Sequence, residues 1–107
     1  MNKPFVNIES PFAGEIERNK EYFKRCIKDC LDRGEAPFAS HAIYTQVLDD
    51  TIPSERRIGM EAGFEVLKRT DYSVVYDDYG VSNGMLEGIK IAKELKHPII
   101  YRKIGKN

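Results

Sequence analysis

Carboxylates, glycines and hydroxyl groups crowd the segment Tyr76–Ala92, where a strand is expected to give way to a helix. Asp77 and Asp78 follow the expected strand directly. Glu87 lies on the expected helix, on the same face as Gly84 and one turn further along. Carboxylates that share a partly dry pocket push one pKa upward, as a catalytic acid requires. The same residues are also consistent with a solvated helix acid and two ordinary turn formers.

Ser82 is predicted to be the N-cap of this helix, which makes Asn83 and Gly84 its first two positions. The free N–H groups and the helix dipole at such a terminus favour an anion or a polar ligand oxygen. Because Gly84 has no Cβ, a ligand can approach the backbone there closely. We therefore expect these three residues to contact a ligand.

Polar residues also mark the end of the first expected strand. Asn7 and Glu9 share one face of that strand, and their polarity near its carboxyl end indicates a ligand-facing role, unless the strand lies at a sheet edge. Ser10 and Pro11 continue the same corner and are expected ligand contacts. Phe12 either stacks on a base or covers the core.

Three further candidates lie near the starts of later elements. Arg18, in the first turns of the next expected helix, could reach a phosphate, although a surface arginine is more often a solvated charge. His41 and Tyr44 follow the second expected strand and are candidates to contact a sugar or a phosphate. The alternative for His41 is a structural hydrogen-bonding role, which is the commoner one for a lone histidine.

The alternation of strands and helices along the chain is what brings these corners together. The strands are expected at Pro4–Glu9, Ala36–Ser40, Tyr72–Tyr76 and His97–Lys103, and the helices at Glu15–Arg33, Pro53–Thr70 and Ser82–Lys96. This order implies right-handed crossovers and a parallel sheet. The predicted fold class is α/β, an open, mainly parallel sheet of four to five strands flanked by helices in a Rossmann- or flavodoxin-like three-layer sandwich. Ligands of such sheets bind at the carboxyl ends of the strands.

Local signals refine these elements. Gly34 is expected to form a left-handed cap after the first helix, and Thr51 or Ser54 to cap the second. Residues 41–50 are ambiguous and are interpreted as a loop with a turn or two of helix. Gly59 and Gly63 form a smooth helix face that favours close helix packing, including packing across a dimer.

The length and composition narrow the possible functions. The 107 residues fit a single domain, 1–107, whose modest core would benefit from self-association into a homo-oligomer. The 17 Lys and Arg residues balance the 17 Asp and Glu residues, so the chain lacks the excess of positive charge typical of nucleic-acid-binding proteins. Cys26 and Cys30, four residues apart, are interpreted as buried thiols in a reducing compartment. With no apolar run of spanning length and no leader pattern, we expect a cytoplasmic protein without membrane contact, metal or cofactor.

Three motifs together resemble the nucleoside 2-deoxyribosyltransferase-like superfamily. They are the small-Pro-Phe turn Ser10–Phe12 after the first strand, the aspartates after the third strand, and "SNGMLEGIKIA" closing with "KHPII". The stretches "SPFAGEIERN" and "GEAPFASHAIYTQVLDD" are similar to small, often phage-borne members of that superfamily, whose location would be the host cytoplasm. The resemblance covers nearly the whole chain.

The resemblance implies roles for residues of the third corner. Glu87 would be the nucleophile, Asp77 or Asp78 would bind ribose or base, and Ser82 and Gly84 would bind ribose or phosphate. A carboxylate can attack an anomeric carbon and hold a glycosyl-enzyme intermediate, while a second acid protonates the leaving base. The chain departs from the family pattern at Glu9 and Ser10, where small residues are usual, and it is short for these enzymes.

Two classes of function follow. The first is an enzyme that cleaves or transfers the N-glycosidic bond of a nucleoside or nucleotide through Glu87. The second is a non-catalytic sponge or sensor of a nucleotide or ADP-ribose-like signal. A structural oligomer with a vestigial pocket is a weaker third interpretation. The sequence favours a nucleotide-type pocket more strongly than it favours turnover.

Overall fold

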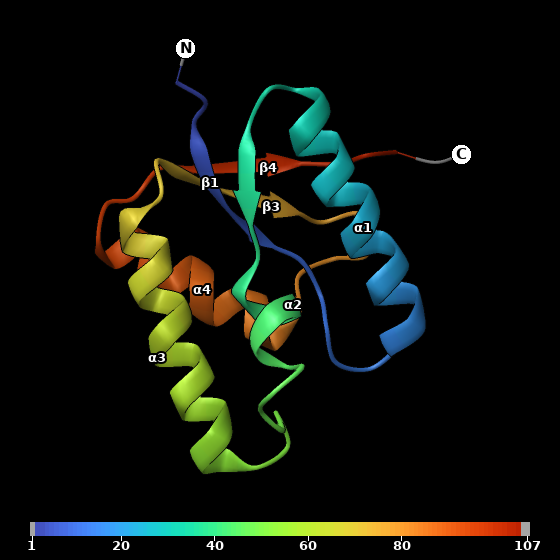
Figure 1. Ribbon diagram of the computed structural model, residues 1–107, viewed down its shortest axis with the longest axis vertical. Helices are drawn as coiled ribbons and strands as arrows, with labels where there is room; N and C mark the ends of the chain where they lie inside the picture. Colours follow the sequence, from blue (N-terminus) through green and yellow to red (C-terminus); the bar gives the residue numbers. More distant parts are fainter. Residues whose placement is uncertain (1, 106–107) are drawn as a thin grey trace.

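Short apolar strands alternate with longer helices and build a parallel sheet (Figure 1). The computed structural model describes residues 2–105. Its elements are β1 (Phe5–Glu9), α1 (Ile16–Asp32), β2 (Ala36–Phe38), α2 (Ser40–Tyr44), α3 (Pro53–Arg69), β3 (Tyr72–Tyr76), α4 (Asn83–Glu94) and β4 (Ile99–Arg102). The predicted α/β class with an open parallel sheet is confirmed. The sheet has four strands.

The strand order is β2-β1-β3-β4, and all three pairings are parallel. Because β1 pairs with both β2 and β3, it is an interior strand, which excludes the edge interpretation of Asn7 and Glu9. The chain leaves β1 toward β2 on one side and later returns to β3 on the other side. The carboxyl ends of β1 and β3 therefore flank the topological switch point, where α/β sheets bind ligands.

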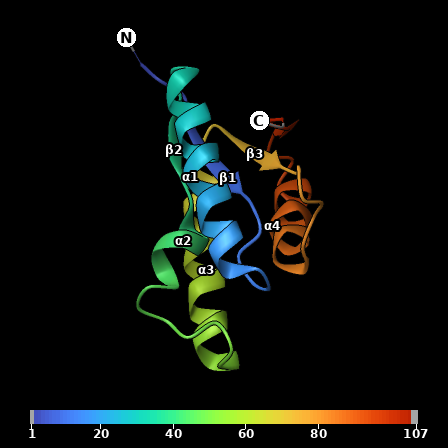
Figure 2. The ribbon, with the colours of Figure 1, turned by 90° about the vertical axis from the view of Figure 1, so that its right-hand side faces the viewer.

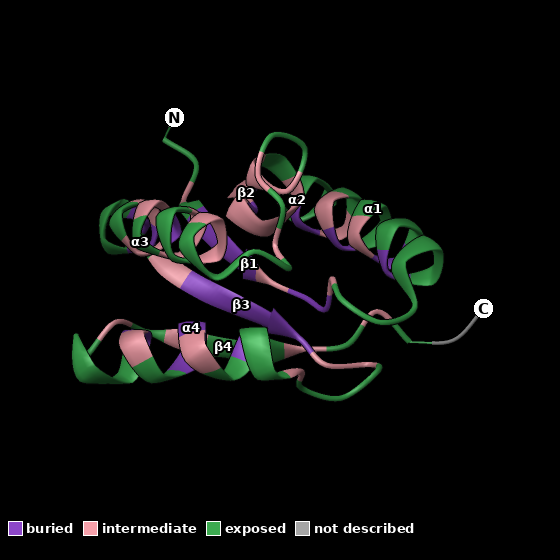
Figure 3. Ribbon diagram, turned by 90° about the horizontal axis from the view of Figure 1, so that it is seen from below, coloured by how far each residue is buried: buried purple, intermediate pink, exposed green. Residues whose placement is uncertain are grey.

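Alternating side chains of the strands face two different layers of helices. Val6, Ile8 and Val74 pack with α1 in one buried cluster. Val75, from the opposite face of β3, packs with Met85 of α4 in another. Figure 2 shows α1 and α4 on opposite sides of β3, and Figure 3 shows that β3 is buried along nearly its whole length. Helix α3 contacts β1 and α4, and so completes the layer that covers the second face.

The predicted helix ends are partly confirmed. The hydroxyl of Ser82 accepts a hydrogen bond from the Met85 N–H, as expected of an N-cap, and Gly34 has φ +86° after the end of α1. The expected cap of α3 is wrong: Ile52 occupies that position and makes no side-chain capping bond. The hydroxyl of Thr51 instead donates to Asp49 within the preceding turn, which removes it from the helix end.

The glycine face of α3 packs against α2 of the same chain. A Cβ on Gly63 would lie 2.7 Å from the Ser40 hydroxyl oxygen, and one on Gly59 would lie 3.3 Å from Leu48 Cδ1. Both distances are tight for carbon atoms, so the two glycines permit the close approach of these segments. Close helix packing is confirmed, but α2 and the following turn at Leu48 cover this face, and the face is therefore not available to a second subunit.

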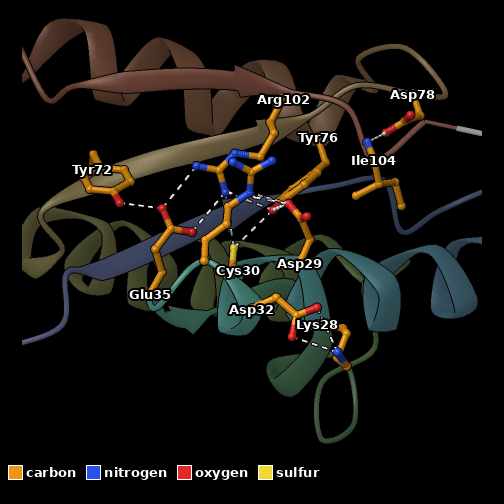
Figure 4. A network of polar contacts seen from close by, with 11 residues as sticks. Lys28, Asp29, Cys30, Asp32, Glu35, Tyr72, Tyr76, Asp78, Arg102 and Ile104 are labelled. Atoms are coloured by element: carbon orange, nitrogen blue, oxygen red, sulfur yellow. Dashed lines mark hydrogen bonds and ion pairs between the residues drawn. The ribbon is translucent and has the colours of Figure 1, made fainter.

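The α1 side of the sheet holds a network of partly buried polar groups (Figure 4). The guanidinium of Arg102 donates to both carboxylate oxygens of Glu35 at 3.0 and 3.1 Å, and Tyr72 donates to the same carboxylate. Burial acts to raise the pKa of Glu35, but the hydrogen bonds from Arg102 and Tyr72 outweigh it and lower this pKa to about 2. Tyr76 joins Arg102 to Asp29. Every charge in this network has a partner, so it serves the fold.

The two cysteines lie in the same layer. Cys26 and Cys30 are free thiols with no exposed surface, as expected. Burial raises the pKa of the Cys26 thiol to about 12 and that of Cys30 to about 11, which keeps both thiols unreactive at neutral pH. None of the helices within residues 2–105 is long and apolar enough to cross a lipid bilayer.

Candidate functional site

A cavity of about 590 Å³ opens at the carboxyl end of β1, bounded by the β1–α1 turn and by α2, α3 and α4. This is the side of the sheet that the topological switch point selects. Ten residues predicted from the sequence line it: Asn7, Glu9, Ser10, Phe12, His41, Tyr44, Ser82, Asn83, Gly84 and Glu87. The fold therefore unites residues from all three predicted corners in one place.

Glu9 is the most enclosed carboxyl group of the cavity. The Asn7 side-chain amide donates to Glu9 Oε2 at 3.2 Å, and it also donates to the Ser73 hydroxyl at 3.0 Å. The carboxyl group lies against Gly88 of α4, where any Cβ would overlap it. Burial raises the pKa of Glu9 to about 7, although the hydrogen bond from Asn7 acts in the opposite direction. Glu9 can thus hold or release a proton near neutral pH.

Glu87 stands on α4 beside a guanidinium. Arg56 of α3 donates to Glu87 Oε1 at 2.6 Å and, through its other terminal nitrogen, to Asp50 Oδ2 at 3.1 Å. All three side chains are between 34% and 44% exposed. The ion pair therefore joins α3 to α4 across the cavity wall while water still reaches it, so its net contribution to stability is small, about 1 kcal/mol or less per pair.

His41 and Ser10 form a neutral polar pair. The Ser10 hydroxyl and His41 Nε2 are 2.9 Å apart. Burial lowers the pKa of His41 to about 4, so the imidazole is uncharged at neutral pH. The His41 ring packs nearly perpendicular to the Phe23 ring of α1, with 5.7 Å between ring centroids, which restricts its position. His41 can orient a ligand hydroxyl, but it is a weak proton donor.

The first turn of α4 presents backbone to the cavity. Its three predicted contacts, Ser82, Asn83 and Gly84, all line the wall. The Ser82 hydroxyl is engaged with the Met85 N–H at 3.3 Å. A Cβ on Gly84 would have no atom within 4 Å, so there is open space where a ligand can meet the backbone.

Four predicted site residues are not among those lining this cavity. Asp78 accepts hydrogen bonds from the Tyr22 hydroxyl and from the backbone N–H groups of Ile104 and Gly105, and so holds the segment that follows β4. Burial acts to raise its pKa, but these donors outweigh it and lower the pKa. Asp77 pairs with Lys103 at 2.9 Å.

The other two are Arg18 and Pro11. The Arg18 guanidinium lies 4.1 Å from the centre of the Tyr79 ring, a cation–π contact. Pro11 lines a neighbouring groove between α1 and α2. Asp77 and Asp78 lie outside the cavity because β3 ends beside β4. The turn after Tyr76 therefore contacts the segment that follows β4, and the two aspartates pair with that segment.

The sequence analysis missed Arg56 and the wall of α3. Besides Arg56, the cavity is lined from this region by Thr45, Leu48, Asp50, Glu55, Met60 and Phe64. One signal could have found them. A crossover helix of a parallel sheet starts near the carboxyl ends of the strands, so polar residues in its first two turns are candidates for a ligand site at that edge. Arg56 is the fourth residue of α3.

The charges around the cavity are predominantly negative. The lining contains three carboxylates, Asp50, Glu55 and Glu87, and one guanidinium, that of Arg56, which gives a net charge of −2 before Glu9 is counted. The N-terminus of α4 contributes only about +0.5. The cavity therefore disfavours a multiply charged anion. Nowhere in residues 2–105 do three or more His, Cys, Asp or Glu side chains gather as in a metal site.

Comparison with known proteins gives one match. The model of a family described as "Domain of unknown function (DUF7768)" matches residues 4–102, which span all four strands and the whole cavity. No curated protein and no solved structure matches the chain. The α/β domain with its carboxylate-lined cavity thus belongs to the DUF7768 family.

Proposed function

We propose that this domain binds a nucleoside-type ligand in the cavity and cleaves or transfers its N-glycosidic bond, with Glu87 as the nucleophile. The observation that carries the proposal is the position of Glu87, on the cavity wall one turn below the open backbone of Gly84. A ribose ring beside that backbone could present its anomeric carbon to the carboxylate. The resemblance of "SNGMLEGIKIA" to the deoxyribosyltransferase-like pattern supports the same role.

The chemical step balances with groups of this chain. A Glu87 oxygen forms a bond to the anomeric carbon while the carbon–nitrogen bond breaks, and the electron pair leaves with the base. Water or a second base then attacks the anomeric carbon and frees Glu87. Because Arg56 donates to Glu87 Oε1, the attack uses Oε2 or follows a shift of Arg56 toward Asp50.

The lining favours an uncharged ligand. Its aromatic side chains, Phe12, Tyr44 and Phe64, suit a planar base. The net negative charge of the wall opposes phosphate groups, so we expect nucleosides to bind better than their 5′-phosphates. A volume of about 590 Å³ is within the range of small-molecule sites.

A binder without turnover is the second candidate. The ion pair between Glu87 and Arg56 favours it, because a carboxylate engaged by a guanidinium is a weaker nucleophile. In this case Glu87 orients Arg56, and the ligand is held but not changed.

Incubation with a panel of nucleosides and their 5′-monophosphates tests the proposal. We expect free base by chromatography from nucleosides, loss of that release in Glu87→Gln, and full release in Glu94→Gln, an exposed glutamate on the same helix that does not line the cavity. Ligand-induced stabilisation without base release would support the binder; at 100 times the dissociation constant it amounts to about 2.7 kcal/mol. Neither release nor stabilisation by any member of the panel would refute both candidates.

Location and assembly are part of the same proposal. We place the protein in the cytoplasm, where the buried thiols of Cys26 and Cys30 stay reduced. We also propose self-association, through a surface other than the glycine face of α3. Analytical ultracentrifugation at micromolar concentration measures it, and a mass equal to one chain at every concentration would contradict it.

A further inference from the structure

The proposed cleavage needs a proton for the departing base, and the structure changes which residue can provide it. Asp77 and Asp78 are held by Lys103 and by the C-terminal backbone, away from the cavity. Among the other titratable groups of the lining, Arg56 and Glu87 are engaged with each other, and His41 is uncharged at neutral pH. Asp50 and Glu55 are also committed, to Arg56 and to the Asp49 backbone N–H. Glu9 is the carboxyl group that remains.

We propose that Glu9, held between Asn7 and Gly88 at the end of β1, is the acid that protonates the leaving base. This inference rests on the proposed function and adds a second catalytic residue to it. Glu9 lines the same cavity as Glu87, and its carboxyl group lies over Gly88, the residue that follows Glu87 in α4. Both carboxyl groups can therefore reach one ligand bound in this cavity.

The packing around Glu9 fixes its orientation. Asn7 donates to Oε2, and Asn7 is itself held by Ser73 on the neighbouring strand β3. Because an N–H group already points at Oε2, the proton of the neutral acid is better placed on Oε1. The missing side chain of Gly88 provides the space for the carboxyl group. Burial then raises the pKa of Glu9 to about 7, the range in which general acids work at neutral pH.

The proton transfer leaves the charge of the cavity unchanged. As the carbon–nitrogen bond breaks, the proton moves from Glu9 to a nitrogen of the base, which departs neutral. Glu87 becomes a neutral glycosyl ester, and Glu9 becomes the carboxylate. In the second step Glu9 takes a proton from the attacking water or from the second base. One negative charge thus alternates between the two carboxyl groups, so the enclosed site of Glu9 holds it only while Glu87 is uncharged.

A pair of substrates that differ in their need for a proton tests this role. The base of 7-methylguanosine carries a positive charge and leaves as a neutral molecule without protonation, whereas the base of guanosine needs a proton. Both ribonucleosides and their 2′-deoxy forms are given to the wild type, Glu9→Gln and Glu87→Gln. Base release is followed by chromatography, and circular dichroism verifies that each variant is folded.

We expect Glu9→Gln to lower kcat on the unmethylated substrate by about 100-fold or more, the usual contribution of a general acid. On the 7-methyl substrate we expect less than about a 10-fold change in the same variant, and Glu87→Gln to lose both activities. Equal losses on both substrates in Glu9→Gln would overturn the acid role while the proposed cleavage stands. A wild type that releases base from none of the four substrates would overturn the acid role, and the proposed cleavage would fall with it when the whole nucleoside panel also gives no free base.

Discussion

Replacing Glu9 with glutamine should make the protein more stable at alkaline pH. Glutamine has nearly the same shape and can still accept the hydrogen bond from Asn7, but it never ionises. In the wild type, burial raises the pKa of Glu9 from 4.5 to about 7 in the folded state. The unfolded chain therefore loses this proton at lower pH than the folded chain does. Stability from the neutral carboxyl group is complete below pH 4.5 and declines as pH rises to about 7.

The size of the effect follows from that shift. One pKa unit corresponds to about 1.4 kcal/mol, so the shift from 4.5 to about 7 costs the wild type about 3 kcal/mol above pH 7. This is a large part of the 5–15 kcal/mol typical of a small domain. The chain contains no tryptophan, so urea unfolding is best followed by circular dichroism. The free energy of unfolding is compared between wild type and Glu9→Gln from pH 5 to pH 8.

We expect the free energy of unfolding of Glu9→Gln to rise relative to that of the wild type as pH increases. Between pH 5 and pH 8 this difference should grow by about 2–3 kcal/mol in favour of the variant. Glu35→Gln is the opposite control, because the pKa of Glu35 is lowered to about 2 and its contribution is lost only as pH falls below 4.5. The deficit of that variant should stay constant from pH 5 to pH 8. Parallel curves for wild type and Glu9→Gln would refute the claim that Glu9 of the folded protein titrates near neutrality.

Two further substitutions test the packing. Gly88→Ala should destabilise the fold by about 1–2 kcal/mol, because overlap with the Glu9 carboxyl group outweighs the gain of about 1 kcal/mol in helix propensity; Gly84→Ala, in open space on the same helix, should be neutral or stabilising. Melting temperatures that rise equally in Gly88→Ala and Gly84→Ala would show that Gly88 is not in contact with Glu9. Arg102→Met should cost about 3–5 kcal/mol in urea unfolding, because it leaves a buried carboxylate unpaired, whereas Lys103→Met at an exposed ion pair should cost less than about 1 kcal/mol. Equal small losses at 102 and 103 would contradict the structural role of the network.

Local chemistry accounts for the parts of the fold that were predicted correctly. Ser82 caps α4 because its hydroxyl reaches a backbone N–H three residues ahead, and Gly34 ends α1 because glycine tolerates a positive φ. The predicted N-cap of α3 was wrong for a reason that capping preference alone does not give. Thr51 and Ser54 both have side chains suited to an N-cap, but Asp49 accepts a hydrogen bond from the Thr51 hydroxyl within the preceding turn.

In the candidate site, too, some features follow from the sequence pattern and others only from contacts between distant segments. Ten lining residues were predicted because the ends of parallel strands must meet at one edge of the sheet. Arg56 was missed because its partner Glu87 is 31 residues away, and no sequence spacing connects them. Asp77 and Asp78 were expected in the site, but the C-terminal segment provides their hydrogen-bond partners.

The sequence by itself determined the parallel sheet, the edge of the sheet at which the cavity opens and the residue types that crowd the turn before α4, since these depend on short-range patterns along the chain. Tertiary structure decided which carboxyl group is enclosed and which is paired. Glu9 is shielded only because β1 lies between β2 and β3 and because Gly88 brings α4 close. Glu87 is paired only because Arg56 of α3 lies beside it in the folded chain. The proton affinity of a side chain depends on the solvent and charges around it, and those are set by contacts between segments far apart in the chain.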